Sequence, residues 1–232
     1  RHVSDEKKLS YEDARDALRI FAESAAEQVL TFHEAGFATL RREAFGAYPA
    51  DIQRRVLSSA ILAIAPADYA PGFEALEQAR EEITGTEFTG RTLAGCEIFK
   101  DKDDAALICR EAATAPPPEK LEEDLLWDGR YRVSCYRAAT ASGEDLEIGI
   151  LGEEGLSQLR QKSRSDDPVF ARLESLPFKV KKTLPGLWKT GNLMAVPYLN
   201  WTDKAAPAAM SKIAIAFVTD AAPKPGIRGK IV

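Results

Sequence analysis

The chain has 232 residues, of which 45% are hydrophobic and 29% charged, and its net charge is −5 at pH 7. This composition excludes a disordered or collagen-like chain, and the lack of any apolar run of about 18 residues speaks against a membrane partner. The charge is uneven, because residues 1–159 carry a net charge of −13 and residues 160–232 a net charge of +8. Positive potential, which a polyanionic partner needs, is therefore concentrated near the C-terminal end.

The first hundred residues are predicted to begin as helices. A capping-box pattern at Ser10 opens an amphipathic helix whose apolar positions recur at steps of three or four through residue 32. Pro49 opens a second helix, which Pro66 ends, and Pro71 opens a third, which runs through residue 83. Strands at 91–99 and 105–110 are then expected to form a hairpin around a polar turn at 101–104.

Three consecutive prolines at residues 116–118 fix the backbone φ and remove hydrogen-bond donors, so they predict a semi-rigid linker. Beyond it, the pattern predicts strands at 131–136 and 146–151 joined by a turn at 142–145, helices at 155–164 and 168–182, and strands at 193–196 and 213–218. The predicted fold class is α+β. Residues 1–114 form a helical bundle closed by a β-hairpin, residues 115–124 the linker, and residues 125–232 a small α+β domain.

Residues able to support catalysis are sparse. Cys96, Cys109 and Cys135 are too few for a disulfide framework and lack the spacing of a zinc site, so reduced thiols and a cytoplasmic location are expected. The three thiols are expected to be free, although strand pairing could place Cys96 and Cys109 opposite each other across the hairpin. His2 and His33 each lack a second ligand at metal spacing, which favours helix capping or solvent exposure. No catalytic or metal-ligating set is nominated.

Basic residues between positions 160 and 189 form the strongest candidate binding feature. They could neutralise phosphates, while the interleaved aromatic rings could stack on unpaired bases. A solvated polar face whose aromatic residues turn into the core has the same pattern, so both interpretations stay open. The basic residues are Arg160, Lys162, Arg164, Arg172, Lys179, Lys181, Lys182 and Lys189, and the aromatic ones are Phe170, Phe178 and Trp188.

Three stretches resemble motifs of tRNA(Ile)-lysidine synthases of the alphaproteobacterial type. Residues 90–98, GRTLAGCEI, are similar to the RTLGGC hairpin of that family, and residues 126–131, LWDGRY, to its WDGRF motif. Residues 176–188, LPFKVKKTLPGLW, followed by LMAVP, resemble its C-terminal block. The family's usual Trp-hydrophobic-Arg-Asp-Arg is replaced by KVKKT. Thr183 is therefore not carried over as an RNA contact, and Lys181 is kept only as a point charge without the bidentate fork of arginine.

The resemblance implies that the chain is the C-terminal, tRNA-binding region of such a ligase. In this family an N-terminal domain uses ATP and magnesium to activate the wobble cytidine of tRNA(Ile) and attaches lysine, while two C-terminal domains grip the tRNA. The expected partners are tRNA(Ile) and a catalytic N-terminal domain of the same polypeptide, and homodimerisation is left open. No cofactor and no independent activity are expected in this chain. The expected tRNA contacts are Arg160, Arg164, Lys179, Lys181, Lys182 and Lys189.

Two other functions remain in view. A protein-interaction module could use the acidic and the basic parts of the chain to bind each other or a partner, without any RNA ligand. An independent small-molecule enzyme is the second alternative, and the lack of a nucleophile, base or metal constellation weighs against it.

Overall fold

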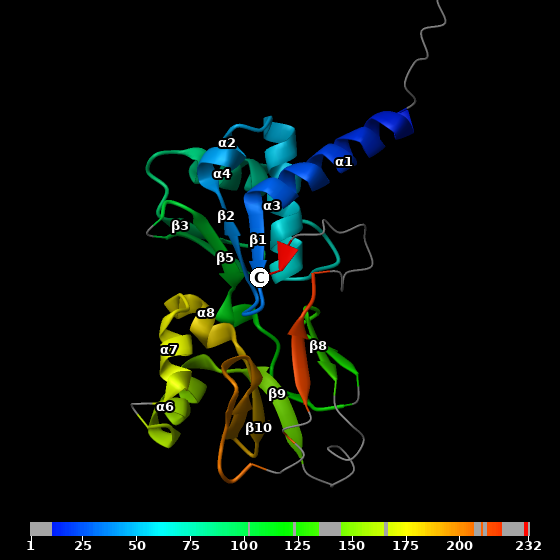
Figure 1. Cartoon of the computed structure of the whole chain (residues 1–232). Helices are drawn as coiled ribbons and strands as arrows, with labels where there is room; N and C mark the ends of the chain where they lie inside the picture. The colour runs from blue at the N-terminus through cyan, green and yellow to red at the C-terminus, as the bar shows by residue number, and fades with distance from the viewer. Residues whose placement is uncertain are drawn as a thin grey trace, which may run out of the picture.

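The structure of the chain is a computed structural model that describes residues 11–101, 103–122, 124–134, 145–164, 167–206, 210, 213–219 and 230–231. Two lobes follow one another along the molecule (Figure 1). The first lobe contains the N-terminal helices and strands, and the second contains the later helices and two further sheets. The predicted α+β class is confirmed. No helix among the described residues is long and apolar enough to cross a membrane.

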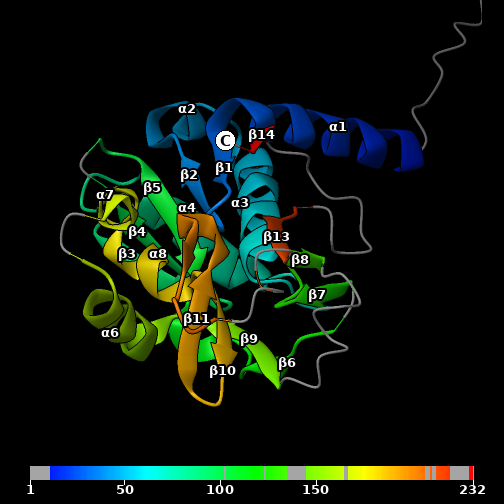
Figure 2. The same ribbon diagram turned by 60° about the horizontal axis from the view of Figure 1, so that its bottom comes forward.

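The first lobe is a layer of helices on a six-stranded sheet of order β14-β1-β2-β5-β4-β3. Its neighbouring strands are antiparallel except β14 and β1, which run parallel and lie side by side (Figure 2). The helices are α1 (Tyr11–Val29), α2 (Arg42–Gly46), α3 (Ala50–Ile64) and α4 (Phe73–Thr84). The strands are β1 (Leu30–His33), β2 (Phe37–Leu40), β3 (Gly90–Leu93), β4 (Cys96–Lys100), β5 (Ala106–Arg110) and β14 (Lys230–Ile231).

The predicted helical bundle closed by a hairpin is wrong in two respects. The first helix ends at Val29, and Phe32 lies in β1, where burial alternates residue by residue as in a strand. The apolar spacing could not reveal this, because a short apolar run is ambiguous between helix and strand. The segment at 91–99 also forms two strands, because Ala94 and Gly95 adopt φ values of 48° and 76° and turn the chain between them.

The second lobe has a five-stranded sheet, β12-β11-β10-β9-β6, and a three-stranded sheet, β13-β8-β7. The predicted linker contributes to this lobe, because Glu119–Lys120 forms β6 and pairs with β9. Most of the predicted turn at 142–145, and Cys135, lie outside the described residues. The helices are α6 (Gly152–Lys162), α7 (Pro168–Glu174) and α8 (Phe178–Thr183), with 3-10 turns η1 (Ala112–Thr114) and η2 (Pro197–Leu199). The remaining strands are β7 (Leu125–Trp127), β8 (Tyr131–Ser134), β9 (Leu146–Ile150), β10 (Pro185–Lys189), β11 (Asn192–Val196), β12 (Trp201–Thr202) and β13 (Ala214–Phe217).

Strand β5 is buried on both faces and joins the two lobes. Ile108 belongs to the apolar cluster that the helices of the first lobe cover. Leu107 and Cys109 point to the opposite face, as alternation along a strand requires, and belong to a cluster with Leu159 and Val180 of the second lobe. Both clusters contain residues from before and after the proline segment. The lobes therefore share their apolar cores.

The register of β4 and β5 also separates the two described thiols. Cys96 lies opposite Arg110, whereas Cys109 lies opposite Glu97, and cross-strand partners share a face of the sheet. Cys96 and Cys109 consequently point to opposite faces and do not lie opposite each other across the hairpin. Both are buried and free.

Candidate nucleic-acid interface

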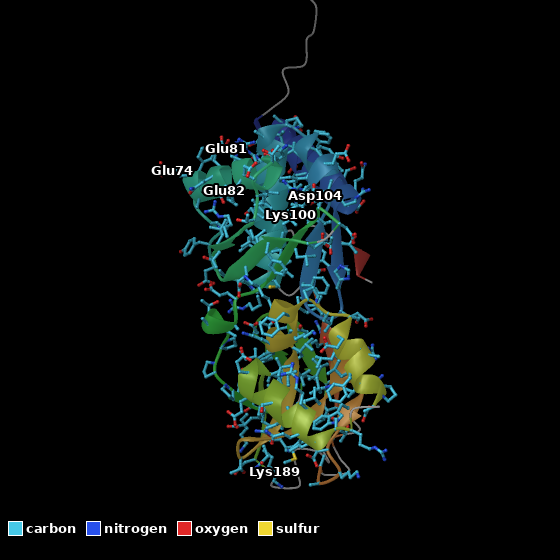
Figure 3. All side chains as sticks on the ribbon, turned by 90° about the vertical axis from the view of Figure 1, so that its left-hand side faces the viewer. Glu74, Glu81, Glu82, Lys100, Asp104 and Lys189 are labelled. Carbon is cyan, nitrogen blue, oxygen red and sulfur yellow. The ribbon has the colours of Figure 1, made fainter. Side chains whose placement is uncertain are left out.

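The residues predicted to bind RNA are divided between helices α6 to α8 and the end of β10. Arg160 lies in the last turn of α6, and Arg164 follows that helix. Helix α8 contacts both α6 and β5 and lies at the junction of the lobes (Figure 1). Lys189 lies at one end of the molecule, and the acidic side chains Glu81 and Glu82 of α4 lie towards the other (Figure 3). The turn that follows Lys189 lies against α6, because Gln158 Nε2 donates to the Gly191 carbonyl at 3.0 Å.

The three lysines of α8 are each engaged by a carboxylate. Lys179 pairs with Glu97 of β4 in the first lobe, and its ammonium lies 5.1 Å from the centre of the Phe99 ring. Lys182 Nζ lies 2.5 Å from Glu153 Oε1 at the start of α6. Lys179 thus bridges to the first lobe, whereas Lys182 pairs within the second.

Lys181 was expected to be an exposed point charge, but its side chain is only 8% exposed. The buried face of α8 is formed by Val180, Lys181 and Thr183, so the lysine stem packs inward. Its Nζ donates a hydrogen bond to Glu174 Oε2 of α7 at 2.8 Å, which holds the pKa of that carboxyl below its usual range. The expected phosphate contact at Lys181 therefore conflicts with its burial, and the residue ties α8 to α7.

Two exposed arginines, Arg160 and Arg172, have different surroundings from the α8 lysines. Within the described part of the chain, no carboxylate lies at ion-pair distance from Arg160 or Arg172. Arg172 belongs to the basic cluster seen in the sequence but was not among the predicted contacts. Its guanidinium lies 4.9 Å from the centre of the Tyr198 ring. Only the tertiary structure distinguishes these cations from the neutralised lysines of α8.

The WDGRY motif forms a buried joint between the two lobes. Asp128 and Gly129 adopt φ values of 50° and 62°, which turns the chain between β7 and β8. Arg130, fully buried, donates from Nε to Asp128 Oδ2 at 2.7 Å. Arg110 of β5 donates from its own Nε to both oxygens of the same carboxylate at 3.2 Å. One buried carboxylate thus holds two guanidinium groups from different lobes.

The same joint holds the tip of the β1–β2 hairpin. Arg130 Nη1 donates to the Gly36 carbonyl at 2.9 Å, and Tyr131 Oη donates to the Ala35 carbonyl at 3.1 Å. Gly36 has a φ of 77°, and a Cβ there would lie 1.9 Å from Tyr131 Oη, so only glycine fits. Arg110 Nη1 also donates to the carbonyl of Gly95 in the RTLAGC hairpin at 2.9 Å. Both short motifs therefore have a structural role at the contact between the lobes.

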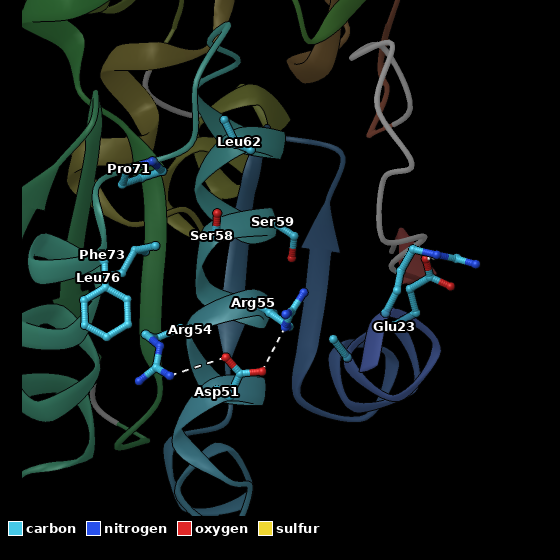
Figure 4. Close-up of a pocket in the computed structure, with 12 residues that line it drawn as sticks. Glu23, Asp51, Arg54, Arg55, Ser58, Ser59, Leu62, Pro71, Phe73 and Leu76 are labelled. Carbon is cyan, nitrogen blue, oxygen red and sulfur yellow. Dashed lines mark hydrogen bonds and ion pairs between the residues drawn. The ribbon is translucent and has the colours of Figure 1, made fainter. Parts of the chain in front are cut away.

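A groove of about 440 Å³ opens on the first lobe between α1, α3 and α4 (Figure 4). Phe73 is 66% exposed at its edge, and the guanidinium of Arg54 lies 4.7 Å from the centre of that ring. Arg54 and Arg55 both donate to the Asp51 carboxylate, at 3.4 and 3.0 Å. Because the cations are bonded to this carboxylate, the groove is a weaker candidate for phosphate binding than the face around Arg160.

Other titratable side chains serve packing. Burial raises the pKa of the Cys96 and Cys109 thiols to about 12. His33 was predicted to cap a helix or to face solvent, but it is half-buried in β1 and stacks on Phe37 with ring centroids 4.1 Å apart. Among the residues that the structure describes, no group of three or more His, Cys, Asp and Glu side chains could hold a metal ion.

The chain is similar to curated tRNA(Ile)-lysidine synthases of three alphaproteobacteria. It is 27% identical to that of Wolbachia pipientis over 204 residues, which are 84% of this chain and 43% of the relative. It is 29% identical to that of Anaplasma marginale over 128 residues (53% and 28%), and 36% identical to that of Bartonella tribocorum over 87 residues (37% and 17%). No family model matches the chain. The chain spans less than half the length of these relatives, and the resemblance predicted from its motifs is confirmed.

Proposed function

We propose that this chain is the C-terminal, tRNA-binding region of a tRNA(Ile)-lysidine synthase, and that a catalytic domain of the same polypeptide carries the ATP-dependent ligation of lysine. The observation that carries this proposal is the extent of the match. The match covers 84% of this chain but 43% of the Wolbachia relative, so more than half of that relative lies outside the match. A role in tRNA processing also implies a cytoplasmic location.

The charge distribution supports tRNA as the partner. Residues 160–232, which run from the end of α6 through β14, carry a net charge of +8, whereas the preceding residues carry −13. Association with a polyanion would orient residues 160–232 towards the RNA and keep the acidic residues before them away from most phosphates. In this proposal Arg160, Arg164 and Arg172 contact phosphate directly.

The α8 lysines have a secondary role in the proposed interface. Lys179 and Lys182 are partly exposed, so they could exchange a carboxylate for a phosphate oxygen, whereas Lys181 supports the fold. In this proposal Lys189, at the end of β10, contacts phosphate at the end of the second lobe. The joint around Asp128 holds the two lobes together. We therefore propose that the chain recognises the shape and the backbone of tRNA.

Titration of the purified chain with a tRNA(Ile) transcript at several salt concentrations tests the proposal. We expect the logarithm of the association constant to fall by about 0.9 for each contacted phosphate per tenfold rise in salt. Arg160→Ala should flatten that dependence, whereas Arg55→Ala, a control for an exposed arginine bonded to Asp51, should leave it unchanged. Absence of tRNA binding at low salt would refute the proposal and favour a protein-interaction module.

A further inference from the structure

A cavity of about 410 Å³ lies where the lobes meet, within the range of sites that hold small ligands. We call it the junction cavity. Its lining includes Glu34 from the β1–β2 turn, Arg172 from α7, Tyr198 from η2, Asn200 and the backbone of β13. Each of these supplies a different kind of contact. The cavity thus combines a cation, an anion, an aromatic ring, an amide and main-chain groups.

Arg172 is held in place without losing its charge. Its guanidinium lies 4.9 Å from the centre of the half-buried Tyr198 ring. With the Asn200 amide oriented to satisfy both neighbours, its oxygen accepts from Arg172 Nη1 at 3.0 Å and its nitrogen donates to the Pro197 carbonyl at 3.3 Å. A ring and an amide oxygen fix the guanidinium but do not neutralise it. Such a group is well suited to bind a phosphate at the rim of the cavity.

Strand β13 presents main-chain groups to the same cavity. Among the described residues it is an edge strand, because it pairs with β8 on one side only. Val218 N donates to the Arg130 carbonyl at 2.9 Å, and bonded pairs alternate along an antiparallel ladder. Ile215 and Phe217 therefore direct their own N–H and C=O groups away from β8. Both residues line the cavity, so a donor and an acceptor are available there.

We infer that the junction cavity holds one unpaired nucleotide of a bound RNA, with its phosphate at Arg172 and its base against Tyr198. Unpaired bases are recognised by stacking on aromatic or guanidinium planes and by hydrogen bonds to their edges. Asn200, Glu34 and the edge of β13 supply donors and acceptors for such an edge. A base-paired nucleotide does not offer its stacking face, so duplex RNA is not a ligand of this cavity.

This inference rests on the proposed function, because it names the element of tRNA that the junction would bind. A peptide strand added to the free edge of β13 is the main alternative. The nucleotide is favoured because a peptide would use the β13 edge but has no need of an uncompensated guanidinium stacked on a ring. A bound nucleotide would require the Tyr198 ring, whereas a peptide strand on the β13 edge would not. Substitution of Tyr198 therefore distinguishes the two ligands.

The test uses three labelled probes on the full chain: a single-stranded hexaribonucleotide, a blunt RNA duplex and a tRNA(Ile) transcript. Tyr198→Ala should weaken hexaribonucleotide binding at least about fivefold without changing its salt dependence, because stacking is not electrostatic. Tyr198→Phe keeps the ring and should bind like wild type. Arg172→Ala should flatten the salt dependence by about one unit. Tyr69→Ala, which removes an exposed tyrosine from the first lobe, is the matched control.

Hydrogen exchange on the wild-type chain gives a readout that requires no variant to fold. The hexaribonucleotide should protect the backbone of 213–217 and of 198–200, and the duplex should not. Unchanged hexaribonucleotide affinity in a folded Tyr198→Ala, together with no such protection, would overturn the inference. Protection of β13 by an extended hexapeptide of alternating Thr and Val, with none by RNA, would also overturn it.

The outcomes separate this inference from the proposed function. The proposed function would be upheld and the nucleotide cavity refuted if tRNA binding depends on salt, is unchanged in Tyr198→Ala and leaves the β13 backbone unprotected from exchange. Hexaribonucleotide binding that requires Tyr198, without any affinity for tRNA, would uphold the cavity and refute the assignment to tRNA.

Discussion

Arg130 and Asp128, two residues apart in the chain, form a buried ion pair at the joint between the lobes, with Nε and Oδ2 2.7 Å apart. The carboxylate is 5% exposed and also accepts from Arg110, whose side chain is 10% exposed. Two guanidinium groups therefore depend on one carboxylate. The pair connects the core strand β5 to the WDGRY turn, and through Arg130 Nη1 to the hairpin tip at Gly36.

Removing this carboxylate should destabilise the whole molecule. Asp128→Ala leaves two buried cations without a counter-charge, so we expect the free energy of unfolding to fall by about 3–5 kcal/mol. Urea denaturation followed by circular dichroism measures this change. Asp145→Ala is the control, because Asp145 is 86% exposed and its surface pair with Lys120 should contribute less than about 1 kcal/mol. Equal effects of the two substitutions would contradict the structural role of the joint.

Lys181 and Arg160 should behave differently although both were predicted to touch RNA. Lys181→Ala removes a largely buried side chain and its hydrogen bond to Glu174, which should cost about 1–2 kcal/mol of stability and leave the salt dependence of tRNA binding unchanged. Arg160→Ala should change stability by less than about 0.5 kcal/mol and flatten the salt dependence by about 0.9 units. Thermal melts and tRNA titrations distinguish the two, and the reverse pattern would refute the assignment.

The two described thiols should be unreactive in the folded protein. A pKa of about 12 leaves a thiolate fraction on the order of 10⁻⁴ at pH 8, and both sulfurs are buried. In a Cys135→Ser variant, Ellman's reagent should therefore detect almost no thiol in the native state. In denaturant without reductant it should detect both Cys96 and Cys109. Rapid labelling of the native variant would show that the sheet opens far more readily than its packing indicates.

Stability should decrease as the pH falls below the ordinary range of histidine. Burial lowers the pKa of His33 below its ordinary value of 6.5. The unfolded chain therefore binds this proton more tightly, so stability rises with pH through the window just below 6.5 and levels off above it. Melting temperatures between pH 7.5 and 5.5 should fall more for the wild type than for His33→Gln. Parallel curves would show that His33 keeps an ordinary pKa in the folded state.

ATP with magnesium should bind this chain negligibly. A triphosphate is usually held where a strand leads through a turn into the N-terminus of a helix. The sequence instead predicts that residues 142–145 form a turn between two strands, and most of these residues lie outside the part of the chain that the structure describes. Calorimetric titration of the chain with ATP and magnesium should show no heat of binding. Affinity in the low micromolar range would mean that the chain carries a nucleotide site of its own.

Much of the local structure could be predicted from the sequence because its signals are local. Pro49 and Pro66 mark the ends of α3, since proline is compatible with a helix start but not with its interior. The α+β class followed from the change in apolar periodicity, and the resemblance to lysidine synthases from the order of short motifs. The charge asymmetry between residues 1–159 and 160–232 follows from counting the charged residues in each part. None of these inferences depends on which distant segments meet.

The tertiary structure alone decided what depends on distant partners. Whether residues 30–40 extend a helix or form a hairpin was settled by the pairing of β2 with β5, some 70 positions later. The opposite faces of Cys96 and Cys109 follow from strand register, in which a shift of one residue reverses every side chain. The sequence could not show that Lys181 is buried against Glu174 while Arg172 lies against the Tyr198 ring, because ion pairing depends on which carboxylates the fold brings within a few ångströms.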